Sequence, residues 1–135
     1  MVIQAYIRVL SDEATIHAIQ REANVSQARV KRLGARRGET GGKRWWEWGT
    51  DITAVDPDKP DDEIKAMLRR HRPIFPFITK HLRPHIDIDI YLEIVARYAE
   101  GDDPRGLCLS AETVLLVSEL GGAVDIDVVP LLEQF

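Results

Sequence analysis

The chain has 135 residues, of which 44% are hydrophobic and 30% are charged, and its formal net charge is −4. This length suits one domain covering residues 1–135. The acidic total argues against a dedicated nucleic-acid-binding protein, and no run of about 18 apolar residues is present to cross a membrane.

The first ten residues alternate between apolar and polar side chains, which predicts a strand over residues 2–10. Ile3 and Ile7 belong to its apolar row, and Tyr6 and Arg8 belong to the polar row. The segment lacks a basic leader and a small-residue cleavage site, so we do not interpret it as a signal peptide. The expected location is therefore the cytoplasm.

A helix is predicted over residues 12–23, with Ser11 as its N-cap and Asn24 as its left-handed end. A short strand over residues 28–33 and a glycine-rich basic loop follow. The aromatic content of residues 43–48 predicts another strand, with Trp46 and Trp48 on one face and Trp45 on the other.

The central part of the chain predicts one long interrupted helix. Aspartates between residues 56 and 62 are expected to cap it, and apolar residues at helical spacing begin at Ile64. Pro73 and Pro76 remove backbone donors, so a break is expected near Arg72.

Residues 86–95 alternate almost without a break between apolar and polar side chains, and residues 124–129 repeat this pattern. Alternation predicts two half-buried strands, with Val124, Ile126 and Val128 on the inner face of the second. The polar row of the first strand contains Asp87, Asp89, Tyr91 and Glu93. Between the two strands, a helix is expected to start at Ser110 and to stop at Gly121.

This order of elements predicts an α+β fold. We expect a two-layer α/β sandwich of the ferredoxin-like plait kind, with a mainly antiparallel sheet and helices on one face. Helices on both faces would have required a continuous apolar run instead of the alternation in residues 86–95.

The chain resembles a family of small bacterial proteins, number 4279 among the domains of unknown function. The resemblance covers about residues 5–129. Its carriers are the opening strand and helix, the Gly38-Glu39 pair before the tryptophan strand, the long central helix, the strand from Ile86, and the ending L-S-A-E-T-V-L-L-V-S-E-L-G-G-A-V-D-I-D-V. Pro73 and Pro76 depart from the usual central helix. The resemblance implies the fold, and no established activity, catalytic residue or cofactor.

The polar sheet face is the first candidate site. If the strands that begin at residues 86 and 124 are neighbours, their aspartates crowd one surface and repel each other. Arg8 or Arg97 of the chain, a basic partner, or a hard divalent ion can offset that repulsion. The alternatives are a solvated sheet face and a pair of catalytic carboxylates. The candidate partner-binding residues are Arg8, Asp87, Asp89, Tyr91, Asp125 and Asp127.

A basic segment forms the second candidate site. Cations beside aromatic rings are typical of proteins that bind single-stranded nucleic acid, and an acidic protein surface is an alternative ligand. A solvated loop beside core aromatics is the plainer interpretation. The candidate residues are Arg32, Arg36, Arg37, Lys43, Arg44 and Trp45.

The sequence predicts no cofactor and no metal site. His81 and His85 have the spacing of zinc ligands on a helix, but Pro84 between them is expected to end the helix. Cys108 lies between two leucines and is expected to fill core space.

The favoured functional hypothesis is a non-enzymatic protein-binding module, of the immunity or accessory kind, that uses its open sheet face. The alternatives are nucleic-acid binding through residues 29–44 and an enzyme with an unrecognised carboxylate site. An exposed edge strand would also allow two copies to pair as a homodimer.

Overall fold

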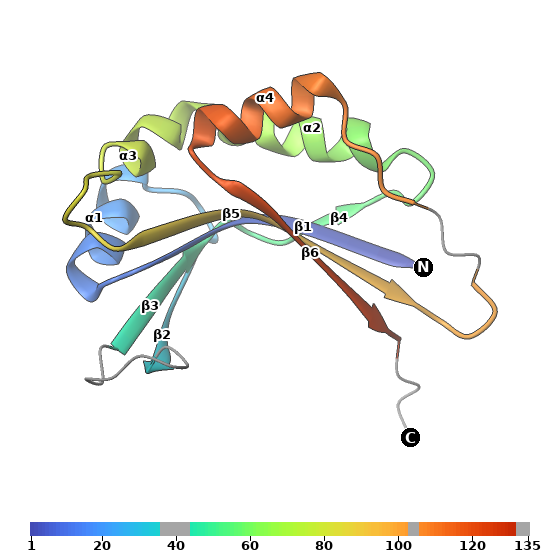
Figure 1. Ribbon diagram of the computed structural model, residues 1–135, viewed down its shortest axis with the longest axis horizontal. Helices are drawn as coiled ribbons and strands as arrows, with labels where there is room; N and C mark the ends of the chain where they lie inside the picture. The colour runs from blue at the N-terminus through green and yellow to red at the C-terminus, as the bar shows by residue number, and fades with distance from the viewer. Residues whose placement is uncertain (36–43, 103–105, 132–135) are drawn as a thin grey trace.

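The computed structural model describes residues 1–35, 44–102 and 106–131. Single strands or groups of strands are separated by helices along this chain, and every described helix lies on the same face of one sheet (Figure 1). The elements are β1 (Val2–Ser11), α1 (Glu13–Ala23), β2 (Arg29–Ala35), β3 (Arg44–Gly49), β4 (Thr53–Val55), α2 (Pro60–His71), a 3-10 turn (Arg72–Ile74), α3 (Phe75–Thr79), β5 (Ile88–Tyr98), α4 (Ala111–Leu120) and β6 (Ala123–Pro130).

The predicted α+β class is confirmed, but the sheet is mixed. Its strand order is β2-β3-β1-β5-β6, and the short strand β4, which the sequence pattern did not reveal, also pairs with β1. β6 runs parallel to β5 because α4 carries the chain back to the end from which β5 began. The expectation of a mainly antiparallel, ferredoxin-like plait is therefore not confirmed.

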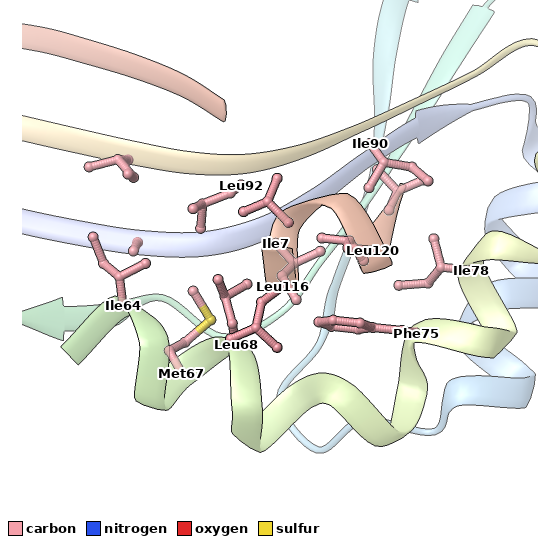
Figure 2. Packing of buried hydrophobic residues seen from close by; sticks show 14 of the residues in the cluster. Ile7, Ile64, Met67, Leu68, Phe75, Ile78, Ile90, Leu92, Leu116 and Leu120 are labelled. Atoms are coloured by element: carbon pink, nitrogen blue, oxygen red, sulfur yellow. The ribbon is translucent and has the colours of Figure 1, made fainter. Parts of the chain in front are cut away.

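The core lies between the centre of the sheet and the helices. β1 and β5 pair in register from Val2 opposite Arg97 to Ser11 opposite Ile88, so their apolar rows point to the same side. Figure 2 shows how side chains of three helices meet these rows. The residues labelled there are Ile7, Ile64, Met67, Leu68, Phe75, Ile78, Ile90, Leu92, Leu116 and Leu120, and all of them are buried.

Of the two predicted ends of α1, the first is wrong and the second is confirmed. The N-cap of α1 is Asp12, which accepts a hydrogen bond from the Thr15 N–H, and not Ser11. Ser11 ends β1 and is buried, and its hydroxyl donates to the Asp87 carbonyl at 2.6 Å. Asn24 does close α1 in the left-handed conformation, with φ of 47°.

The central helix breaks where the prolines predicted, but its start differs. Lys59 occupies the N-cap position of α2 without a side-chain cap, and Pro60 fills the first turn. None of the aspartates between residues 56 and 62 provides the expected side-chain cap, and one of them contacts α4 instead. Asp61 Oδ1 accepts from the Ser110 N–H at 2.9 Å and from the Thr113 hydroxyl at 2.7 Å, and so ties α2 to the start of α4.

Asp61→Ala should lower the free energy of unfolding by roughly 1 to 3 kcal/mol, because it leaves polar groups at the start of α4 without an acceptor. Urea denaturation measures this loss. Asp62→Ala is the matched control, since Asp62 is exposed and lies in the same first turn of α2. Equal losses in the two variants would contradict the assigned role of Asp61.

Candidate functional site

The sheet face opposite the helices, here called the free face, carries the polar rows of the central strands. Because paired residues share a face, the register places Tyr6 of β1 beside Glu93 of β5, and Glu93 beside Asp125 of β6. Asp127 follows two residues along β6, opposite Val95. The free face is therefore polar across three neighbouring strands.

On the β3 side of the free face, a buried carboxylate is neutralised by cations. Glu47 forms ion pairs with Arg8 and, at 3.4 Å, with Lys31. Burial alone would lower the pKa of Arg8, but its hydrogen bond to Glu47 and the charge of that residue outweigh burial and raise it. Arg29 stacks over the Tyr6 ring at 4.8 Å from its centroid. On this half of the face, the negative charge of Glu47 is therefore balanced by nearby cations.

On the β6 side, three carboxyl groups meet instead. Oxygen atoms of Glu93, Asp125 and Asp127 all lie within 4.8 Å of one another. Glu93 is only 2% exposed, whereas Asp127 is exposed to solvent. Oε2 of Glu93 is inaccessible to solvent and meets no hydrogen-bond donor among the described residues. We call these three residues the carboxylate cluster.

The carboxylate cluster retains a proton at neutral pH. Burial is the largest cause that raises the pKa of Glu93, and together with hydrogen bonds from its protonated form to Asp127 and Asp125 and with the charges of those carboxyls it brings this pKa to about 9. Burial also raises the pKa of Tyr6, and the charges of Glu93 and Glu47 contribute to that shift. Acidic groups therefore dominate the electrostatics around Glu93.

The structure brings only part of the predicted partner-binding set together. Asp125 and Asp127 lie side by side with Glu93. The sequence pattern predicted that Glu93 belongs to the polar row, but Glu93 was not among the predicted partner-binding residues. Asp89 pairs with Leu10, and β6 begins opposite Tyr91, beyond Asp89. Asp87 precedes β5. Tyr91 lies opposite Arg8, which binds Glu47.

The predicted basic site is described only in part. Arg36, Arg37 and Lys43 lie outside the described residues, while Arg32 is exposed on β2 and Arg44 begins β3. Trp45 is buried, with 5% of its surface exposed, so its ring is not presented for stacking on a base. Nucleic-acid binding stays a prediction that the described residues do not favour.

Two further predictions concern potential ligands. α3 ends at Thr79, so neither His81 nor His85 lies on a helix, and the zinc-like spacing has no common helix face. The expectation that Cys108 fills core space is wrong, because Cys108 is exposed. It follows Gly106 and Leu107 in the irregular segment before α4.

Comparison with known proteins agrees with the resemblance seen in the sequence. Residues 1–131 match the family described as a domain of unknown function, DUF4279. The chain belongs to this family. A search of the curated proteins finds no match to this DUF4279 protein. Across residues 1–35, 44–102 and 106–131, no helix combines the length and apolar character needed to span a bilayer.

The raised pKa of Glu93 predicts how the stability of the DUF4279 protein depends on pH. An ordinary Glu ionises near pH 4.5, whereas folded Glu93 keeps its proton to about pH 9. Between these values the folded state binds the extra proton, so the free energy of unfolding falls as pH rises, by up to about 1.4 kcal/mol per pH unit.

Urea denaturation at pH 5.5 and pH 8.5 measures this dependence. The side chain of the Glu93→Gln variant cannot ionise. The free energy of unfolding of this variant should therefore fall less between the two pH values, and at pH 8.5 the variant should be more stable than the wild type. Asp89→Asn, on the same face of β5, is the control and should preserve the wild-type slope. An unchanged slope in Glu93→Gln would contradict the assignment of the proton to Glu93.

Proposed function

We propose that this DUF4279 protein is a protein-binding module whose partner adds a strand to β6. The observation that carries the proposal is an apolar row on β6 that the rest of the described chain leaves exposed. Such edge strands bind extended segments of other proteins through main-chain hydrogen bonds, and side-chain pockets give specificity.

The sequence predicted that the apolar row of β6 is buried, and that prediction is wrong. Val124, Ile126 and Val128 share the helix side of the sheet with buried residues of β5, yet Val128 is 65% exposed. α4 packs mainly against α2 and does not cover β6. Exposed apolar residues in a regular row indicate a surface that a partner covers.

The outer edge of β6 presents main-chain groups at the same residues. The N–H of Leu131 donates to the carbonyl of Tyr98, so the main-chain groups of odd-numbered residues on β6 face β5. Those of Val124, Ile126 and Val128 therefore point outward, and Pro130, which has no N–H, occupies the next outward position. In the described chain, no strand follows β6 in the sheet.

A groove beside β6 offers space for the partner's side chains. Its volume is about 260 Å³, and its walls are mainly apolar. Ile126 and Val128 border it together with Ile94, Ala96, Tyr98 and Leu107. An added strand would place alternate apolar side chains over this groove, while its other face would lie beside Asp127 of the free face. Basic residues at those other positions suit the partner.

Affinity capture from extract of the source cells tests this function. Val128→Pro removes an outward N–H without removing a hydrogen bond to β5, and Ile126→Lys places a charge in the apolar row. Both changes should abolish recovery of a protein that the wild-type chain retains, with at least a tenfold reduction in the amount captured. Thermal melting of each purified variant checks that it is folded.

Leu115→Lys is the matched control, because Leu115 is an exposed apolar residue on α4 and lies outside the groove. This variant should capture the partner as the wild type does. Equal recovery by the β6 variants would refute the proposed surface. A wild-type chain that is a stable dimer in isolation, and that Val128→Pro makes monomeric, would instead assign the edge to a second copy.

A further inference from the structure

We propose that the carboxylate cluster of Glu93, Asp125 and Asp127 is a binding site for a hard divalent cation, with Ca²⁺ as the test ion. This inference does not rest on the proposed strand-binding function, because it concerns the free face of the isolated chain. It also names a ligand where the sequence predicted no metal site.

The free face contains two buried glutamates whose charged neighbours differ. Glu47 and Glu93 are both buried on this face, with 5% and 2% of their surfaces exposed. Glu47 has two cationic partners, Arg8 and Lys31, whereas the ionisable neighbours that set the pKa of Glu93 are two further acids. Burying a carboxylate without a cation is costly, so the β6 side of the face lacks the charge that the β3 side contains.

The burial of Glu93 points to a ligand more directly than the nearness of the three acids does. When Glu93 is ionised, its Oε2 is a buried oxygen that meets no donor in the described chain, although buried polar atoms are nearly always satisfied. Arg8 is the basic residue of β1 on this face, and it is already bound to Glu47. The Glu93 carboxyl lies against Asp125 and Asp127, so a cation that bound there would satisfy it.

The spacing of the oxygen atoms suits an ion of the size of Ca²⁺. One oxygen from each residue lies within 4.8 Å of the others. Two ligands on opposite sides of Ca²⁺ are separated by about 4.6 to 5.2 Å, since each Ca–O distance is about 2.3 to 2.6 Å. For three such atoms a common point exists no more than about 2.8 Å from each, so a shift of a few tenths of an ångström lets all three contact one ion. The cluster contains neither His nor Cys, and this donor set favours a hard cation over zinc.

The strands hold this cluster in place and leave a route to it. Glu93 and Asp125 are directly paired between β5 and β6, and Asp127 follows on the same face of β6. All three ligands are therefore fixed by the sheet ladder and not by a loop. Asp127 is exposed, which gives the ion access and leaves room for water ligands.

Isothermal titration calorimetry of the chelator-treated full chain with CaCl2 at pH 7.5 tests the site. We expect one Ca²⁺ per chain and a dissociation constant below about 1 mM, in the range of weak all-oxygen sites. Glu93→Gln and Asp127→Asn should each weaken binding at least tenfold. In the wild type, 5 mM CaCl2 should also raise the melting temperature, and Asp127→Asn should lose this rise. MgCl2 and MnCl2 titrations compare other hard cations.

Asp89→Asn is the matched control, since it removes a carboxylate from the same face of β5 outside the cluster. It should bind Ca²⁺ as the wild type does. Asp125→Asn provides another test if Glu93→Gln does not fold. If none of the three ions at 10 mM gives a heat of binding or a shift of the melting temperature, the proposal is overturned. The cluster would then bind a proton and no metal ion. Equal binding by the cluster variants would overturn the proposal too, because the ion would then lie elsewhere.

Discussion

The pairing of β1 with β5 is the constraint on which the rest of the structure depends. The two strands are paired without interruption from Val2 opposite Arg97 to Ser11 opposite Ile88, and each alternates between apolar and polar side chains. A shift by one residue would turn a whole apolar row toward water. This register therefore assigns one face of the sheet to the helices and leaves Tyr6 and Glu93 on the free face.

Because β6 lies beside β5, acidic residues gather on the β6 side of the free face, whereas cations lie on the β3 side. α4 returns the chain so that Asp125 lies directly beside Glu93, and Arg8, one of the two cations that could have offset the acids, is engaged by Glu47 on β3. The same edge position leaves Ile126 and Val128 exposed on the other face. One strand thus connects the two proposals, a cation on the free face and a protein segment at the edge.

The sequence predicted the elements well wherever local chemistry determines them. Alternation revealed β1, β5 and β6, Pro73 and Pro76 located the helix break, and Ser110 caps α4 as expected. Properties that depend on the packing between elements were missed. The direction of β6 follows from the path of α4, and the burial of Glu93 depends on its neighbours on β1 and β6. No local pattern encodes these contacts between elements.

The proposal to test first is that the carboxylate cluster binds a hard divalent cation. Diffraction from crystals of the full chain grown with MnCl2 tests it most directly, because anomalous scattering distinguishes Mn²⁺ from water and from lighter ions. We expect one anomalous peak in contact with carboxylate oxygens of Glu93, Asp125 and Asp127. A cluster without a peak, in crystals where Mn²⁺ is bound elsewhere on the chain, would contradict it.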